Sequence, residues 1–485
     1  MTIQVEPSKF FVDGKWTAGN STETFELRNP ATGDEIGHVP RATKDDVREA
    51  VEAARKAFEA ASWRDMEQTK RGKLLMQVAA LMRQNFDEFS KLETLNQGKP
   101  IRESKGDVAW TVRVFEYWAG AADKIEGETI PVTPNRLTYT LREPLGVTAH
   151  IIPWNYPLAL AARSIAPALA AGNTIVAKPA ELTPLTLLKI AEYAKKSGFP
   201  DGVLNVITGS GSVAGRELVS NPGIDGITFT GSTETGRQIM ETAAKNVTPV
   251  LLELGGKNPN IVFPDADFEK AVQMAKYAIF TNAGQMCWAG SRLFLHDEIY
   301  EKFLAELRKQ TELMRIGPGL DEKTELGPLV SKDQQERVLT YIKSGREQGA
   351  RLVTGGTVPV ESALRSGYFL RPTIFTDVNA DMKIGCEEIF GPVLTVFKFK
   401  SVEEVVRMAN DTQFGLYAGV WTNNLKLAQR LVNQLQAGVV AVNDYLVAYP
   451  QTPFGGYKDS GIGHESGLQA ISHYTRIKSV TVNAS

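Results

Sequence analysis

Hydrophobic and polar positions follow a helical period over residues 42 to 122. Between Asp45 and Ala54, acidic residues come first and apolar residues then recur at intervals of three and four. This arrangement is typical of an amphipathic helix. Gly98 and Pro100 indicate the end of a later helix. The pattern therefore predicts a set of helices that cover another part of the molecule.

From Gly146 onward, short apolar runs alternate with helical segments, and they predict five buried strands. These strands are expected at residues 147–152, 174–177, 203–207, 226–230 and 250–254. The helix after the first strand should end at Gly172. The next helix should begin with Thr183 as its cap and Pro184 in its first turn, and should end near Gly198. This alternation predicts a mostly parallel, doubly wound α/β sheet, which binds ligands beyond the carboxyl ends of its strands.

The alternation resumes after Gly256. Strands are expected at residues 260–263 and 293–295, and helices at 268–280 and 300–314, which together indicate a second α/β domain. The tail at residues 477–482 alternates like an edge strand. An exposed terminal strand invites pairing with another sheet, so we expect a subunit contact there.

Composition and charge narrow the class of protein. The 485 residues are 42% hydrophobic and 23% charged, which is ordinary for a soluble protein of two or three structural units. With 54 basic and 56 acidic residues, no positive excess favours nucleic acid or an anionic membrane. The apolar run at 158–176 contains Arg163 and Pro167, and predicts a buried helix and strand rather than a membrane span. Because no secretory signal begins the chain, we expect a cytoplasmic location and small-molecule or self partners.

The two cysteines, Cys287 and Cys386, and five scattered histidines form neither a disulfide framework nor a metal site with ligand spacing. Cys287 lies among glycines and polar residues after a predicted helix, where a ligand could reach it. A lone cysteine is most often a small buried apolar residue, but an accessible thiolate can attack an aldehyde. Cys386 is the alternative nucleophile.

A cysteine that attacks an aldehyde needs an oxyanion donor, a general base and a nearby hydride acceptor. Asn155, in the turn after the first strand, could donate an amide N–H. Glu253, at the end of the fifth strand, could be the base. The glycine-containing turns at 209–211 and 231–236 could let the backbone approach a pyrophosphate, although either turn alone is as often merely tight. Lys178 and Glu181 could bind ribose hydroxyls, and a glutamate there would repel a 2′-phosphate, which favours NAD over NADP.

Seven motifs, in order over nearly the whole chain, resemble those of the NAD(P)-dependent aldehyde dehydrogenase superfamily, and their combination is highly specific. The motifs are Pro153-Trp154-Asn155-Tyr156-Pro157, Lys178-Pro179-Ala180-Glu181, Phe229-Thr230-Gly231-Ser232, Leu252-Glu253-Leu254-Gly255-Gly256-Lys257, Gly284-Gln285-Met286-Cys287, Glu388-Ile389-Phe390-Gly391-Pro392 and Pro453-Phe454-Gly455-Gly456. A glutamate at the position of Glu253 favours the hydrolytic type over relatives that pass the acyl group to coenzyme A.

The resemblance implies roles for individual residues. Cys287 would form a thiohemiacetal and then a thioester. Asn155 and the backbone N–H of Cys287 would form the oxyanion hole. Glu253 would activate the hydrolytic water, and Glu465 matches a second acid that assists proton traffic in relatives. The implied cofactor-binding residues are Ile152, Pro153, Trp154, Lys178, Glu181, Gly209, Gly231, Ser232, Leu254, Glu388 and Phe390.

The resemblance also implies three structural units. The expected fold class is α/β, with a Rossmann-like, doubly wound NAD-binding domain at residues 1–124 and 145–254 and a second α/β catalytic domain at 255–459. Residues 125–144 and 460–485 would form a small β region for oligomerisation, and homodimers or homotetramers are usual in such proteins.

The sequence leaves the aldehyde open. Arg163 lies two turns into the helix after Asn155, at a position that often faces the substrate tunnel in relatives. It could pair with the carboxylate of a semialdehyde, or bind a lactaldehyde-like substrate, but an arginine that bonds within the protein is equally expected. Relatives with this arginine usually have Arg-Lys, whereas this chain has Arg163-Ser164.

Tyr156, Trp288 and Phe454 are candidate aromatic residues of the substrate tunnel. They could hold a quaternary ammonium such as betaine aldehyde, or form an apolar lining for an aromatic aldehyde. A catalytically silent structural or binding relative and a coenzyme A-acylating dehydrogenase are the alternative functions. The joint presence of a nucleophile, an amide and a base argues against the silent relative.

Overall fold

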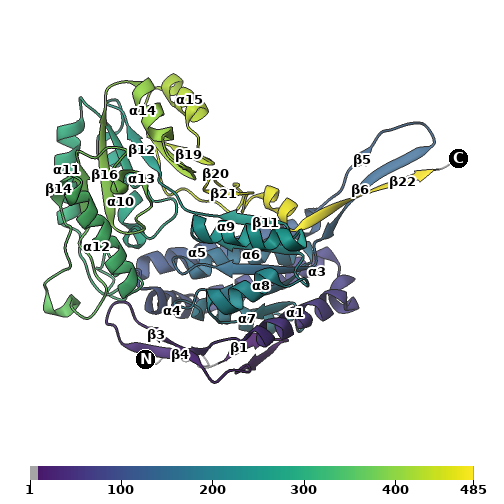
Figure 1. The fold of residues 1–485 in the computed structure, drawn as a ribbon. Coiled ribbons are helices and arrows are strands. Elements are labelled where there is room, and N and C mark those ends of the chain that lie inside the picture. Colours follow the sequence, from purple (N-terminus) through teal and green to yellow (C-terminus); the bar gives the residue numbers. More distant parts are fainter. Residues whose placement is uncertain (1–8, 484–485) are drawn as a thin grey trace.

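The computed structural model describes residues 9–483. Figure 1 shows a sheet wrapped in helices, a second α/β lobe beside it, and an arm that projects from the body. The expected α/β fold class is confirmed. No helix in the described range is long and apolar enough to cross a membrane.

The first sheet has the strand order β2-β1-β9-β8-β7-β10-β11-β21. The five central strands of this order, from β9 through β8, β7 and β10 to β11, are parallel. They confirm the predicted doubly wound sheet. The order reverses between β7 and β10, which places a ligand-binding crevice beyond their carboxyl ends. The strands are β1 (Phe10–Val12), β2 (Lys15–Thr17), β7 (Val147–Ile152), β8 (Thr174–Pro179), β9 (Leu204–Val206), β10 (Gly226–Thr230), β11 (Val250–Glu253) and β21 (Gly461–Ile462).

Two groups of helices cover this sheet (Figure 1). One group packs around α6, whose side chains are all buried, and the other contains α1, α8 and α9. The helices are α1 (Lys44–Glu59), α2 (Ala61–Arg64), α3 (Gln68–Gln84), α4 (Phe86–Gln97), α5 (Ile101–Ala121), α6 (Pro157–Ala171), α7 (Leu185–Lys196), α8 (Arg216–Ser220) and α9 (Thr233–Ala243). The helices predicted from residues 42 to 122 are confirmed.

The ends of these helices follow local chemistry, with one exception. Thr43 and Asp46 form a reciprocal capping box at the start of α1. Gly172 ends α6 with φ +95°, a left-handed conformation that favours glycine. The predicted cap of α7 is wrong, because the helix begins at Leu185, so that Pro184 occupies the cap position and no side chain caps the helix. The Thr183 hydroxyl donates instead to the carbonyl of Trp154.

The second sheet has the order β14-β15-β16-β13-β12-β18-β19 and is parallel except for β14. Buried apolar clusters lie on it, and the predicted second α/β domain is confirmed. Its strands are β12 (Pro259–Val262), β13 (Arg292–His296), β14 (Arg351–Thr354), β15 (Thr373–Thr376), β16 (Val393–Phe399), β18 (Tyr417–Trp421) and β19 (Val439–Val442). Its helices are α10 (Phe268–Phe280), α11 (Tyr300–Glu312), α12 (Lys332–Glu347), α13 (Lys383–Cys386), α14 (Val402–Asn410) and α15 (Leu425–Gln434).

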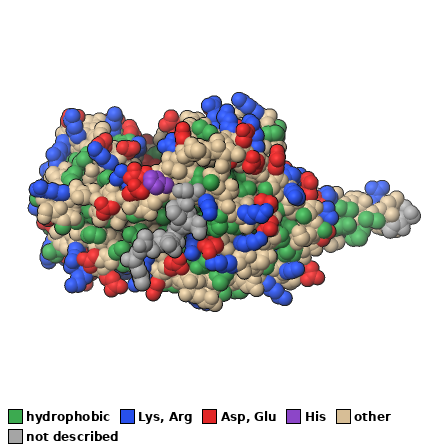
Figure 2. Space-filling view, turned by 90° about the horizontal axis from the view of Figure 1, so that it is seen from below, with side chains coloured by type: hydrophobic (Ala, Val, Ile, Leu, Met, Phe, Trp, Pro, Cys, Tyr) green, Lys and Arg blue, Asp and Glu red, His purple; other side chains and the backbone are tan. Residues whose placement is uncertain are grey.

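The arm is a three-stranded antiparallel sheet of β5 (Thr129–Ile130), β6 (Arg136–Pro144) and β22 (Thr475–Asn483). The predicted edge strand at 477–482 lies within β22. Figure 2 shows the arm standing out from the body with hydrophobic side chains on its surface. The exposed apolar residues of its strands are Ile130, Leu137, Leu141, Ile477 and Val482.

The remaining elements are short. Two further strand pairs are β3 (Thr24–Arg28) with β4 (Glu35–Pro40), and β17 (Phe414–Gly415) with β20 (Tyr457–Lys458). The short helical turns are η1 (Ala122–Lys124), η2 (Gly211–Gly215), η3 (Ala244–Asn246), η4 (Thr281–Gly284), η5 (Ser362–Leu364) and η6 (Leu468–His473). The bounds of the three expected units stay a prediction. Within them, β21 pairs with β11 of the first sheet, although its residues were assigned to the oligomerisation region.

Candidate active site

The loop that carries Cys287 is held in an unusual backbone conformation. Asn282, Ala283 and Gly284 all have positive φ, at 49°, 53° and 72°. Such a conformation costs energy for non-glycine residues and persists only when its surroundings enforce it. Glu103 accepts a hydrogen bond from the Asn282 N–H at 2.8 Å, and the Asn282 side chain donates to the Asn155 carbonyl at 2.9 Å. Contacts from α5 and from the turn after β7 therefore hold the loop in place.

Cys287 and Asn155 lie where two cavities meet. Both residues line a cavity of about 580 Å³ and a second one of about 220 Å³. The larger cavity also contains Tyr156, Arg163, Trp288, Tyr417 and Phe454. The smaller cavity also contains Pro153, Trp154, Gly231, Ser232, Leu254, Glu388 and Phe390. The structure thus brings the predicted substrate residues to one side of the thiol and seven of the predicted cofactor residues to the other.

The Asn155 side chain is held by one hydrogen bond and keeps a second N–H donor. Its Nδ2 donates to the Gln285 carbonyl at 3.1 Å, and the residue is only 4% exposed. An amide NH₂ carries two N–H groups. The second N–H is therefore available to an oxygen atom at the junction of the two cavities.

Glu253, at the end of β11, lies in a buried cluster with Arg163 and Glu465. The guanidinium Nη2 of Arg163 is 3.7 Å from Glu253 Oε2, and its Nε pairs with Glu465 Oε2. Burial raises the pKa of Glu253 well above its ordinary value, Arg163 opposes this shift, and Glu465 adds to it. Arg163 also lies over the ring of Phe454, 4.9 Å from its centroid. Arg163 thus lines the larger cavity, but two carboxylates face its guanidinium.

The Cys287 thiol is in an environment that keeps its proton. Burial raises the pKa of the thiol, the Glu253 carboxylate raises it further, and Arg163 lowers it. Reactive cysteines more often have depressed pKa values. A thiol in this environment has to give up its proton before it can act as a nucleophile.

The smaller cavity has the features of a nucleotide site. Ser232 caps the eleven-residue helix α9, whose N-terminal N–H groups favour an anion. A Cβ on Gly255 would lie 2.6 Å from Glu388 Oε2, so only glycine leaves this space open. The Glu388 carboxylate accepts the Gly256 N–H at 3.0 Å, and burial raises its pKa to about 7. Phe390, with φ +60°, packs edge-on against Trp154.

Lys178, Glu181 and Gly209 form a separate group near the carboxyl ends of β8 and β9. Lys178 Nζ donates to the carbonyls of Pro179 and Gly209 at 3.0 Å, and burial lowers its pKa to about 8. Glu181 accepts the Gly211 N–H at 3.1 Å. None of the three lines the cavity, and neither does Ile152, which is buried in β7.

Two polar residues of the smaller cavity belong to none of the sequence motifs. Gln334 and Arg337 of α12 line it, and they donate to the carbonyls of Phe390 and Glu388 at 2.7 and 3.2 Å. Both are polar residues of an amphipathic helix, and no motif sets them apart. Cys386, the alternative nucleophile, lines neither cavity, and its Sγ donates to the Met382 carbonyl. Within the described range, no cluster of ligand side chains could hold a metal ion.

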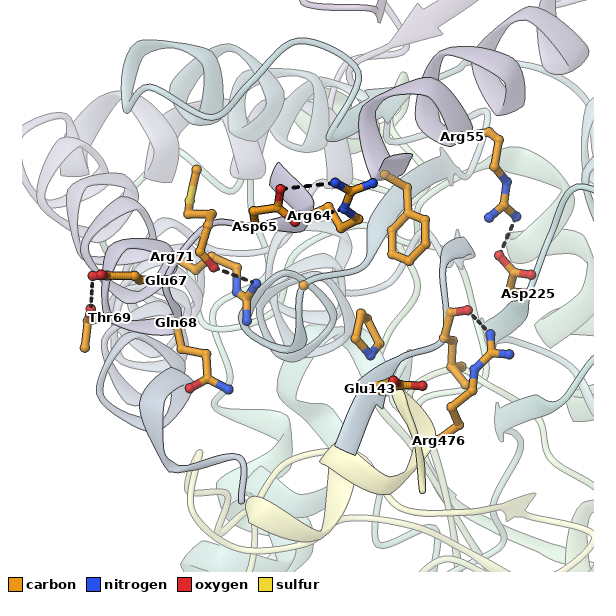
Figure 3. A pocket seen from close by; sticks show the side chains of 15 residues that line it. Arg55, Arg64, Asp65, Glu67, Gln68, Thr69, Arg71, Glu143, Asp225 and Arg476 are labelled. Carbon is orange, nitrogen blue, oxygen red and sulfur yellow. Dashed lines mark hydrogen bonds and ion pairs between the residues drawn. The ribbon is translucent and has the colours of Figure 1, made fainter. Parts of the chain in front are cut away.

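A larger hollow of about 930 Å³ lies near the base of the arm, apart from the thiol (Figure 3). Figure 3 shows its arginines engaged with partners. Arg55 pairs with Asp225 at 2.5 Å, and Arg64 pairs with Asp65 at 2.8 Å. None of the predicted site residues lines this hollow, so its size does not make it the active site.

The chain is similar to known proteins over nearly its whole length. The model of the aldehyde dehydrogenase family matches residues 16–480. The chain is 45% identical to a betaine aldehyde dehydrogenase of Bacillus subtilis, over 98% of this chain and 97% of that one. It is 46% identical to a hydroxyisobutyraldehyde dehydrogenase of Mycolicibacterium austroafricanum, over 99% and 95%. The NAD⁺ complex of an aldehyde dehydrogenase from Bacillus cereus superposes with a TM-score of 0.97 at 46% identity, over 99% and 97%. The chain therefore belongs to the aldehyde dehydrogenase family.

Proposed function

We propose that this enzyme oxidises an aldehyde to a carboxylic acid with NAD, using Cys287 as the nucleophile and water as the final acyl acceptor. The main support is the place of the thiol beside Asn155 at the junction of the two cavities. An aldehyde in the larger cavity and a nicotinamide in the smaller one would both reach it. Glu253 supplies the base for hydrolysis.

The residues around the smaller cavity suit NAD. The N-terminus of α9 would face the pyrophosphate, Glu388 would bind the nicotinamide ribose, and Lys178 with Glu181 would hold the adenosine ribose. NAD bound there would supply the hydride acceptor. The relatives solved with NAD⁺ support this choice. The Glu181 carboxylate favours NAD over NADP, because it would repel a 2′-phosphate.

The chain's own groups account for the other steps. A bond forms between the sulfur of Cys287 and the aldehyde carbon, the carbonyl electron pair moves onto the oxygen, and the thiol proton passes to water. The amide of Asn155 stabilises the resulting oxyanion. Loss of hydride leaves a thioester. Glu253 removes a proton from water, the water oxygen attacks the thioester carbon, and the carbon–sulfur bond breaks to release the acid and the thiolate.

For the substrate, we propose an aldehyde without a carboxylate. The larger cavity is lined by Tyr156, Trp288 and Phe454. Among the described residues that line this cavity, Arg163 is the basic one. Its positive charge is already paired with the carboxylates of Glu253 and Glu465. Apolar and aromatic aldehydes fit this surface better than semialdehydes.

The test of the function is the Cys287→Ala variant. It should produce no NADH absorbance with any aldehyde of a broad panel, while NAD still binds by fluorescence titration. Turnover by this variant would exclude Cys287 as the nucleophile. Failure of the wild-type enzyme across the same panel would favour a catalytically silent relative. Turnover that requires coenzyme A would favour the acylating alternative.

We also propose that the arm joins copies of the chain into a dimer or tetramer. The exposed apolar residues on its strands support this, because monomers rarely expose such side chains together. Light scattering of the wild type and of Leu137→Lys tests it, with a smaller assembly expected for the variant. An unchanged mass would show that the arm face that carries Leu137 does not form the contact between copies of the chain.

A further inference from the structure

Arg163 has a place in the site that the predicted substrate contact does not explain. It projects from α6 toward two carboxylates from distant parts of the chain, Glu253 at the end of β11 and Glu465 beyond β21. We propose that Arg163 is a positioning residue that acts through Glu253, as the internal counter-ion of the Glu253–Glu465 pair rather than as a ligand of the substrate. This inference rests on the proposed function, in which Glu253 is the base.

Glu253 depends on Arg163 because it has little other support. Neither carboxylate oxygen of Glu253 has a hydrogen-bond partner in the described structure, and its side chain is 1% exposed. A buried carboxylate is normally paired or hydrogen-bonded, because losing its hydration is costly. The Arg163 guanidinium, at 3.7 Å, is the opposite charge that acts on Glu253. Removing it would leave Glu253 without compensation.

The cluster holds more acid than base. Two carboxylates share one guanidinium, and all three side chains are at most 8% exposed. Full ionisation would leave one uncompensated buried negative charge, so the cluster retains a proton near neutral pH. Glu465 contacts Arg163 directly, whereas Glu253 lies farther from it. The proton therefore resides mainly on Glu253. The positive charge of Arg163 favours the loss of this proton from Glu253.

Other groups near the cluster are the Cys287 thiol, whose negative form would act on Arg163, and the Tyr474 phenol, which lies near Glu465. In the thioester the cysteine sulfur carries no charge. The Tyr474 phenol is neutral at working pH, since burial raises its pKa. During hydrolysis, Arg163 and Glu465 are therefore the two charges that set the ionisation of Glu253.

Opposite shifts follow for the two partners of Glu253. Loss of the positive charge at Arg163 makes Glu253 harder to ionise, which moves the alkaline rise of thioester hydrolysis to higher pH. Loss of the negative charge at Glu465 removes a like charge and leaves Arg163 to Glu253 alone. That change moves the rise to lower pH. A residue that only bound the substrate would produce neither shift.

The experiment compares Arg163→Met, Arg163→Lys and Glu465→Gln with the wild type, using an uncharged aldehyde such as propanal. Rapid-mixing absorbance separates the first NADH burst from steady-state turnover at a series of pH values. For Arg163→Met, we expect a burst of near wild-type amplitude, a steady-state rate about tenfold lower at pH 7, and a pH profile displaced upward by about one unit. Arg163→Lys should restore most of the rate, and Glu465→Gln should displace the profile downward.

Ser164→Ala is the matched control, because Ser164 is a buried neighbour on α6 whose hydroxyl contacts the carbonyls of its own helix. Its burst and pH profile should remain those of the wild type. An unchanged profile in Arg163→Met, or a rise in KM confined to carboxylated aldehydes, would overturn the inference. If Arg163→Met does not fold, the lysine and Glu465 variants still decide the matter through the direction of their shifts. Absence of any NADH formation by the wild type with propanal would instead contradict the proposed function.

Discussion

Removal of the Asn155 amide tests the oxyanion site directly. The Asn155→Ala variant loses a donor at the junction of the two cavities, where a developing alkoxide would lie. Loss of one such donor typically slows acyl-transfer enzymes about 10²- to 10³-fold, or about 2.7–4 kcal/mol. Because the vacated space opens to a cavity of about 580 Å³, a water molecule can enter and replace part of the donor. We therefore expect a loss near the lower end, about 10²-fold.

The same substitution removes the hydrogen bond from Asn155 Nδ2 to the Gln285 carbonyl. A neutral hydrogen bond contributes about 1 kcal/mol to stability. The loop keeps its contacts to Glu103 and to the Asn155 backbone carbonyl, so the thiol should stay in position. Alkylation of Cys287 by iodoacetamide serves as the control for this, and its rate should change less than threefold, or by about 0.6 kcal/mol.

The assay is the rate of the first NADH burst under saturating NAD. In Asn155→Ala the burst itself should slow, because the oxyanion forms before hydride leaves. A burst rate within about threefold of the wild type, a difference of about 0.6 kcal/mol, would refute the role of the amide. A parallel fall in alkylation would show that the loop had moved and that the loss reports position rather than charge stabilisation.

Three further substitutions or conditions test the remaining groups. Glu253→Gln should leave the first NADH burst visible but lower steady-state turnover at least about 10²-fold, because water loses its base; an equal loss in both phases would contradict this. Alkylation of Cys287 in the enzyme without NAD should accelerate about tenfold for each pH unit up to pH 9, because burial and Glu253 raise the thiol pKa and only the thiolate reacts. The same reaction should be faster in Glu253→Gln at the alkaline pH values where Glu253 is ionised, and a plateau already at pH 7 would refute the raised pKa. Glu181→Gln should increase kcat/KM for NADP relative to NAD, and an unchanged ratio would remove Glu181 from the adenosine site.

The sequence predicts the first sheet well because its strands are buried on both faces. Such strands are nearly continuous apolar runs, and the helices between them have a different period. The added strands β1, β2 and β21 are only two or three residues long, too short for a periodic signal. The Thr183 cap failed for a different reason. The helix begins one residue later than predicted, so Pro184 occupies the cap position, and the Thr183 hydroxyl donates to the carbonyl of Trp154.

The predictability of the candidate site residues also depends on whether they belong to local motifs. Cys287, Asn155 and Glu253 belong to local motifs at strand ends or in a glycine-containing loop, where chemistry is expected of a doubly wound fold. The contact from Glu103 to the Cys287 loop joins residues 179 positions apart, and only the packing of α5 brings them together. A contact between residues so far apart in the chain cannot be predicted from local sequence patterns.

The role of Arg163 cannot be predicted from its residue type alone. A guanidinium in a substrate cavity can bind a carboxylate, and the sequence contains nothing that decides whether the carboxylate comes from the substrate or from the protein. The decision lies in burial. Glu253 and Glu465 are both about 1% exposed, so each would carry a large desolvation cost without a nearby cation. A substrate carboxylate would have to compete with two acids already held at Arg163. Arg163 should therefore pair with Glu253 and Glu465 rather than with a substrate carboxylate. The opposite pH shifts expected for Arg163→Met and Glu465→Gln test this pairing.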